Sequence, residues 1–179
     1  MDDEEARTRL LDTAEELFYA HGIQAVGMDR IRTASGVPLK RLYRLFPAKE
    51  SLVTAYLERR DRRWTDSLRA AAGRPAEPRE RVLAVFDWLA DWFTEPGFRG
   101  CAFVNTHGEL GAAAPEVVRS HKAELRSLLL DLADGRADLA DRLLILVEGA
   151  TAVAALSPGP DPALRARETA ELVLTHAGL

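Results

Sequence analysis

The sequence predicts an all-α protein of about nine helices, in which a small N-terminal three-helix domain precedes a larger helical domain. Apolar residues recur along most of the chain at the three-and-four spacing of one buried helix face, and no stretch shows the alternation of a half-buried strand. Clusters of glycine and proline interrupt this pattern at intervals that match helix lengths. With 179 residues and 47% hydrophobic content, the chain can bury a substantial core.

The first helix is predicted from about Glu4 to His21, where five apolar residues share one face. These residues are Leu10, Leu11, Ala14, Leu17 and Phe18. Gly22 ends the pattern, and Gly27 occupies the expected N-cap of the next helix.

Residues 28–49 are the stretch around which the chain is organised. A short helix is predicted over 28–35 and a second over 39–46, with Gly36 at the sharp turn between them. Ile31 and Ala34 give the first of these helices an apolar face. After the break at Pro47, a long helix is expected to run from residue 49 to residue 72.

The charge of the chain is unevenly distributed. The net charge is −4, yet residues 27–49 hold 6 basic and 1 acidic side chains, whereas residues 1–26 hold 2 and 7. Residues 50–179 hold 16 basic and 20 acidic side chains. The basic excess therefore falls on the helix pair alone, where it can attract phosphates while the acidic remainder limits indiscriminate binding.

Lys40, Arg41 and Arg44 lie on the outer face of the second short helix, opposite its apolar residues. A compact helix pair with a cationic outer face is typical of a helix-turn-helix that places its second helix in the DNA major groove. The alternative interpretation is a solvated helix face, the usual location of clustered charges. The surrounding motif favours DNA binding.

Proline and glycine divide the rest of the chain into further helices. The segments 73–78 and 157–162, each rich in proline, are the clearest breaks. Helices are predicted over 79–94, 101–110, 115–133, 138–156 and 163–177.

Several N-terminal residues also match a known pattern in their order and spacing. They are Gly22, Ile31, the turn Ala34-Ser35-Gly36-Val37, Leu42-Tyr43-Arg44, Phe46 and Lys49-Glu50-Ser51-Leu52. Through them residues 8–57 resemble the N-terminal domain of TetR/AcrR-type transcriptional repressors. The resemblance implies a DNA-binding domain over 1–48 and a helical ligand-binding and dimerisation domain over 49–179. It also implies a homodimer that binds a pseudo-palindromic double-stranded DNA operator and is released by a small-molecule inducer, which we expect to be apolar or aromatic.

The same resemblance assigns roles in the DNA interface to eight residues: Arg30, Pro38, Leu39, Lys40, Arg41, Tyr43, Arg44 and Lys49. Tyr43 and Lys49 would contact phosphates, and Arg30 would reach the DNA backbone. Leu39, Lys40, Arg41 and Arg44 would lie nearest the base edges. The sequence departs from the family pattern at three positions, because the family usually has a small residue at position 40 and serine or threonine at positions 41 and 27.

The segment from Phe98 to Asn105, followed by Glu109, is similar to a stretch in one branch of these repressors whose members respond to drug-like or electrophilic compounds. This similarity places a ligand pocket between the helices predicted over 79–94, 101–110 and 115–133. The residues assigned to it are Trp64, Phe86, Leu89, Phe93, Cys101, Phe103, Asn105 and His107. The aromatic residues among them could instead belong to the core.

A dimer interface through the last two helices is the other expectation that the resemblance provides. The residues assigned to it are Leu143, Leu146, Val147, Ala150, Ala154, Ala170, Val173 and Leu174. These small and apolar side chains could instead be buried within one subunit.

No sequence pattern indicates catalysis, a cofactor or a metal site: there is no serine–histidine–acid order, phosphate loop or paired-carboxylate motif. No apolar run approaches the roughly 20 residues of a membrane span, and the single cysteine, Cys101, fits a reducing compartment, so we expect a cytoplasmic protein that is not an enzyme. Two alternatives stay open. One is a thiol-based repressor that senses oxidants or electrophiles through Cys101, and the other is a helical enzyme or binding protein whose N-terminal motif is incidental.

Overall fold

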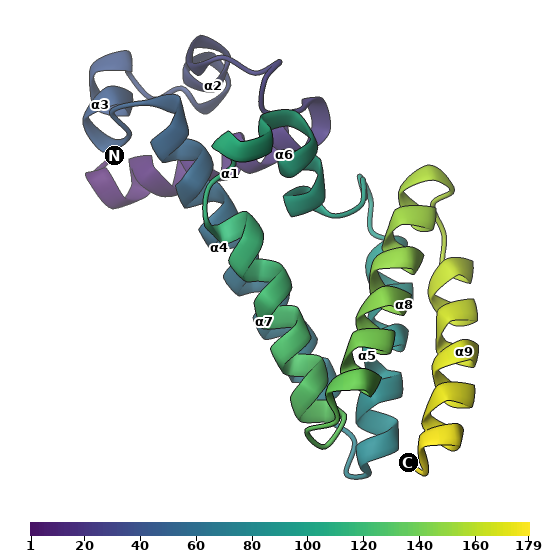
Figure 1. The fold of residues 1–179 in the computed structure, drawn as a ribbon. Helices are drawn as coiled ribbons and strands as arrows, with labels where there is room; N and C mark the ends of the chain where they lie inside the picture. Colours follow the sequence, from purple (N-terminus) through teal and green to yellow (C-terminus); the bar gives the residue numbers. More distant parts are fainter. The chain divides into compact units, whose positions relative to one another are not determined.

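A computed structural model describes all residues 1–179 as nine α-helices and one short 3₁₀ helix, without strands (Figure 1). The all-α prediction is therefore confirmed. The helices are α1 (Asp3–His21), α2 (Met28–Ser35), α3 (Leu39–Leu45), α4 (Lys49–Ala72), α5 (Pro78–Phe93), α6 (Ala102–Leu110), η1 (Gly111–Ala113), α7 (Val117–Leu132), α8 (Ala137–Leu156) and α9 (Asp161–Ala177). None of them combines the length and hydropathy that a membrane span requires.

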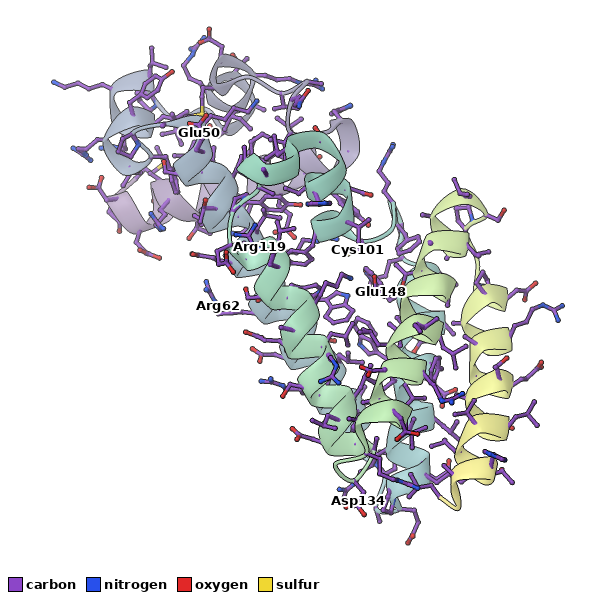
Figure 2. The ribbon with its side chains drawn as sticks, viewed as in Figure 1. Glu50, Arg62, Cys101, Arg119, Asp134 and Glu148 are labelled. Carbon is purple, nitrogen blue, oxygen red and sulfur yellow. The ribbon has the colours of Figure 1, made fainter.

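The chain forms two compact units that alternate along the sequence. Unit 1 comprises residues 1–62 and 102–119, and unit 2 comprises residues 63–101 and 120–179. Figure 2 labels Arg62, Cys101 and Arg119, at which the chain passes from one unit to the other. Because α4 crosses a boundary after Arg62, its first turns pack with α1 to α3, although the DNA-binding domain is predicted to end at residue 48.

Helix ends differ from the predicted ones by at most two residues, and the one element that was not predicted is the short 3₁₀ helix after α6. Gly111 was expected to end that helix, and α6 does end at Leu110, but Gly111 also begins the 3₁₀ turn η1, with a φ of +54°. Pro115 was expected in the first turn of the next helix. It precedes that helix, and its carbonyl accepts a hydrogen bond from the Val118 N–H at 3.0 Å.

Unit 1 is held together by apolar side chains from α1 to α4 that are less than 9% exposed. They include Leu10, Leu11, Ala14, Phe18, Ile31, Leu42, Phe46, Leu52, Tyr56 and Leu57. The rings of Phe18 on α1 and Tyr56 on α4 lie 5.8 Å apart. Ala34, expected on the apolar face of α2, is exposed, so Ile31 is the residue by which that helix is anchored.

Unit 2 is built around α5, which packs on α9 and α8. Its core receives Phe86, Leu89 and Phe93 from α5. It also receives six of the eight residues predicted for a dimer interface, namely Leu143, Val147, Ala150, Ala154, Ala170 and Leu174. Leu146 and Val173 are partly buried against this core. These six side chains are thus enclosed within a single chain, and the apolar side chains that α8 and α9 leave exposed are different ones.

Candidate nucleic-acid interface

The turn between α2 and α3 is fixed by backbone geometry and by one buried hydroxyl. Gly36 adopts a left-handed conformation with a φ of +67°, which glycine tolerates best, and its N–H donates to the Arg32 carbonyl at 3.0 Å. The Ser35 hydroxyl accepts from the Val37 N–H at 3.3 Å. Val37 is 1% exposed and anchors the turn in the core. The sequence therefore sets a sharp angle between two short helices.

Helix α3 presents a buried face and an exposed face. Leu42 is fully buried, whereas Lys40, Tyr43 and Arg44 are exposed. Tyr43 and Leu39 are large side chains left 45% and 44% exposed. An aromatic ring and an apolar side chain beside cations on an exposed helix are expected where a ligand such as DNA covers them.

Two of the predicted DNA-reading arginines are engaged by the start of the chain. Asp3 forms an ion pair with Arg44, and its Oδ1 lies 3.7 Å from Arg41 Nε. Arg41 Nη1 also donates to the Met1 carbonyl at 2.7 Å. These arginines can bind DNA only if the acidic segment that contains Asp3 is displaced from them. The local sequence around α3 does not reveal this competition between Asp3 and DNA.

The other predicted interface residues lie around α3. Pro38 is the N-cap of α3, and its carbonyl accepts from the Arg41 and Leu42 N–H groups at 2.9 and 3.0 Å. Arg30 is exposed on α2, and Lys49 is half-buried at the start of α4, with Nζ 6.0 Å from the Phe18 ring centroid. Gly27 caps α2 in an extended conformation without a side-chain hydrogen bond. All eight predicted residues thus belong to unit 1.

A charged network joins α1 to α4. Arg59 donates to Asp12 and Glu15, both at 2.8 Å, and Arg60 donates to Glu15 at 3.1 Å. The Arg60 guanidinium also lies 4.0 Å from the centroid of the Tyr19 ring. This network fixes the first half of α4, and with it Lys49, to α1.

Glu109 on α6 forms hydrogen bonds with the loop that follows α1. Its two carboxylate oxygens accept from the backbone N–H groups of Ile23 and Gln24 at 3.1 and 2.8 Å. The Gln24 side chain donates in return to the Glu109 carbonyl. A β-carbon added at Gly22, whose φ is +88°, would lie 3.1 Å from this carboxylate. Sequence reasoning assigned Glu109 no role, because its partners are 85 and 86 residues away.

The eight residues predicted for a ligand pocket are divided between the units. Phe86, Leu89 and Phe93 are buried in the unit 2 core, and Trp64 packs against that core. Phe103, Asn105 and His107 lie on α6 in unit 1, where Phe103 is buried and the other two are exposed.

Cys101 is half-buried in unit 2, and its surroundings are charged. The Lys122 ammonium donates to its sulfur at 3.4 Å and to Glu148 at 2.6 Å. Figure 2 labels Cys101 and Glu148. Nowhere in the structure do three or more histidine, cysteine, aspartate or glutamate side chains form a group able to hold a metal ion.

Comparisons with known proteins identify the family. Residues 10–56 match the family model of bacterial regulatory proteins of the tetR family. The chain is 35% identical to a TetR-family transcriptional regulator from Streptomyces coelicolor, with a TM-score of 0.89 over 97% of this chain and 96% of that one. An uncharacterised helix-turn-helix-type transcriptional regulator of Mycobacterium tuberculosis is 33% identical over 191 residues, covering 87% of this chain and 93% of that protein. The chain belongs to the TetR family of transcriptional regulators.

A further relative of this TetR-family regulator is the helix-turn-helix-type transcriptional activator FasR of Mycolicibacterium smegmatis, 33% identical over 89 residues. That match covers 50% of this chain and 41% of the relative. The match to this family confirms the resemblance inferred from residues 8–57. TetR-family proteins are DNA-binding transcriptional regulators and not enzymes. The enzyme and thiol-sensor alternatives are not favoured by these relatives.

Proposed function

We propose that this TetR-family regulator is a repressor that binds a pseudo-palindromic operator as a homodimer and leaves the DNA when a small-molecule inducer binds. The observation that carries the proposal is the two-faced helix α3, which buries Leu42 and exposes Lys40, Tyr43 and Arg44. In this proposal residues 1–48 read DNA, residues 49–179 bind the inducer and the second subunit, and the protein acts in the cytoplasm, where bacterial DNA is transcribed.

The proposed DNA contacts follow from the chemistry of each exposed group. The Tyr43 hydroxyl and the Lys49 ammonium suit phosphate oxygens, since Lys49 begins α4 and the helix dipole favours an anion there. Arg44 and Arg41 suit the two acceptors on the major-groove edge of guanine. Lys40 adds a further exposed cation, which strengthens DNA binding and makes it more dependent on salt.

A homodimer is supported by apolar side chains that α8 and α9 leave uncovered in one chain. Leu156, Leu172 and Ile145 are 88%, 72% and 71% exposed, and Val153 and Leu164 are also exposed. Helices α8 and α9 pack side by side, and exposed aliphatic side chains on two adjacent helices favour association with the same surface of a second copy of the chain. These five residues, in place of the six enclosed in the core, form the dimer surface that we propose.

An apolar or aromatic inducer is supported by the aromatic content of unit 2. Six rings there form one connected cluster of edge-to-face, tilted and stacked contacts, with centroids 4.9 to 5.7 Å apart. The six are Trp64, Trp88, Trp92, Phe93, Phe98 and His121. Such a cluster offers planar apolar surfaces against which an aromatic ligand can pack.

The DNA-binding part of the proposal is tested by isolating bound genomic fragments with the purified protein and then measuring affinity for the recovered operator. Arg44→Ala should weaken operator binding by about 10-fold or more, as expected for loss of a bidentate base contact. Arg69→Ala is the matched control, because it removes the same charge from an exposed position on α4 in unit 2. Equal affinities of Arg44→Ala and wild type would overturn the assignment of α3.

Two further measurements test the dimer and the regulation. Leu172→Glu should convert a dimer into a monomer in sedimentation experiments and should weaken binding to the two-half-site operator more than to a single half-site. A reporter gene placed behind the operator should be repressed by the wild-type protein. A reporter that is activated would identify the protein as an activator, and one that no inducer relieves would remove the ligand-release step.

A further inference from the structure

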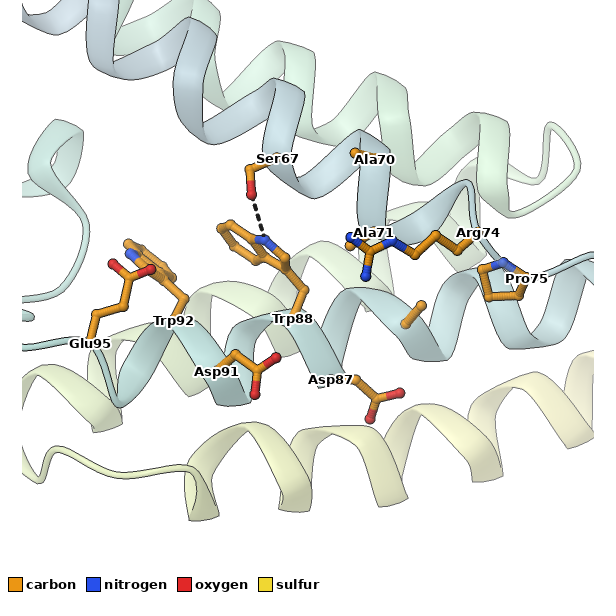
Figure 3. A pocket seen from close by; sticks show the side chains of 11 residues that line it. Ser67, Ala70, Ala71, Arg74, Pro75, Asp87, Trp88, Asp91, Trp92 and Glu95 are labelled. Carbon is orange, nitrogen blue, oxygen red and sulfur yellow. Dashed lines mark hydrogen bonds between the residues drawn. The ribbon is translucent and has the colours of Figure 1, made fainter.

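A groove of about 430 Å³ lies between α4 and α5 within unit 2 (Figure 3). Its α4 side carries Ser67 and small alanine side chains, and its α5 side carries Trp88 and Trp92. The volume falls in the range of about 300 to 1,000 Å³ that small-molecule sites occupy. The groove contains none of the eight residues predicted for a ligand pocket.

The aromatic side of the groove is rigidly built. The rings of Trp88 and Trp92 stack at 5.6 Å with an interplanar angle of 26°, and Trp64 contacts both of them edge to face. The Trp88 indole N–H donates to the Ser67 hydroxyl at 3.0 Å, which fixes the orientation of the ring and satisfies its donor. What remains for a ligand is the π surface of a half-buried indole, which attracts cations and other rings.

Carboxylates line this groove on α5 and in the turn that follows it. Asp87 and Asp91 lie four residues apart and share a face of α5, and Glu95 lies two residues beyond the end of that helix. Asp87 is neutralised by Arg167 at 2.8 Å, whereas Asp91 and Glu95 are exposed and form no ion pair. In Figure 3 the side chains of Asp91 and Glu95 lie beside the two tryptophans, and Arg74 lies toward the other end.

We propose that this groove binds a small planar aromatic cation, which stacks on Trp88 with its positive charge toward Asp91 and Glu95. The combination of a stacked indole pair and two uncompensated carboxylates complements a delocalised positive charge better than a neutral or anionic ring. Arg74 at the far end disfavours a second positive charge, so a monocation fits best. The inference rests on the proposed ligand-responsive function and specifies the class of inducer.

The test compares two probes of similar shape by isothermal titration calorimetry with the full-length protein. One is the 1-methylquinolinium cation, and the other is quinoline at neutral pH, where it is uncharged. Asp91→Asn combined with Glu95→Gln should weaken quinolinium binding about 10-fold and leave quinoline binding unchanged, because only the cation loses an electrostatic partner. Trp88→Leu should weaken binding of both probes.

Glu124→Gln is the control, since it removes one exposed carboxylate from α7 in the same unit. The inference is overturned if quinolinium does not bind, or if the double variant binds it as tightly as the wild type. An operator-release assay run in parallel separates this inference from the proposed function. Quinolinium that binds through Asp91 and Glu95 without releasing DNA supports the site and overturns its assignment as the inducer site. Release by another compound, with no quinolinium binding, overturns the site and leaves the proposed function standing.

Discussion

Replacing Asp3 with asparagine should strengthen operator binding, because Asp3 occupies two arginines that α3 would present to DNA. Its carboxylate forms an ion pair with Arg44 and lies 3.7 Å from Arg41 Nε. Both interactions have to break before the guanidinium groups reach DNA. The free energy spent in breaking them is therefore subtracted from the affinity of the wild-type protein.

The size of the effect follows from the exposure of these groups. The side chains of Asp3, Arg41 and Arg44 are 55%, 31% and 58% exposed. Exposed ion pairs contribute about 0.2 to 1 kcal/mol each, so the two together amount to about 1 kcal/mol in each protomer and about 2 kcal/mol in a dimer. Since about 1.4 kcal/mol corresponds to a tenfold change, an Asp3→Asn dimer should bind its operator about 10- to 30-fold more tightly.

The assay is a titration of a fluorescently labelled operator followed by anisotropy at one fixed salt concentration. Glu4→Gln is the matched control, because it removes the same charge from the same turn of α1 and has no ion pair with either arginine. An equal gain for Glu4→Gln would mean that the acidic N-terminus merely repels DNA at a distance. A loss of affinity for Asp3→Asn would mean that Asp3 orients the arginines for binding. Either result would refute the prediction that Asp3 competes with DNA for Arg41 and Arg44.

Four further predictions concern single side chains. Glu109→Gln should lower the free energy of unfolding by about 2 kcal/mol in urea titrations, because an amide replaces a carboxylate that accepts two backbone N–H bonds. Gly100→Ala should cost about 2 kcal/mol in the same assay, since Gly100 has a φ of +78° and an added β-carbon would lie 2.8 Å from that of Ala155. Cys101→Ser should leave inducer-driven release of the operator unchanged, and loss of release in this variant alone would favour thiol sensing. The hydrogen bond from Arg126 lowers the pKa of Asp141, so this pair stabilises the fold above the ordinary carboxyl pKa and ceases to do so as pH falls through the lowered value. Asp141→Asn should therefore unfold at a lower urea concentration than the wild type at neutral pH and at the same concentration in strong acid.

The fold was predictable because helix formation is encoded locally. The apolar face shared by Leu10, Ala14 and Phe18 defined α1, and Gly22 and Pro47 marked ends that the structure reproduces. The 3₁₀ turn that begins at Gly111 was not foreseen, because glycine at a helix end is compatible with both a stop and a tighter turn.

The candidate site was predictable only to the extent that its residues are neighbours in sequence. Local spacing separated buried Leu42 from exposed Lys40 and Arg44 on α3. It could not reveal that Asp3 engages Arg44 across 41 residues. Nor could periodicity decide whether Leu143 on α8 faces its own core or a second subunit, since both surroundings select the same apolar side chain.

The alternation of the two units along the chain has a consequence for biosynthesis. Unit 1 requires residues 102–119, including the carboxylate of Glu109 that binds the loop after α1. At translation rates of about 5 to 20 residues per second, several seconds separate the appearance of residue 62 from that of residue 119. During this interval α1 to α3 lack the contacts of α6, so a ribosome that stalls there carries an incompletely packed unit 1. The order of synthesis thus delays completion of unit 1, which carries the DNA-binding residues, until more than half of the polypeptide has been made.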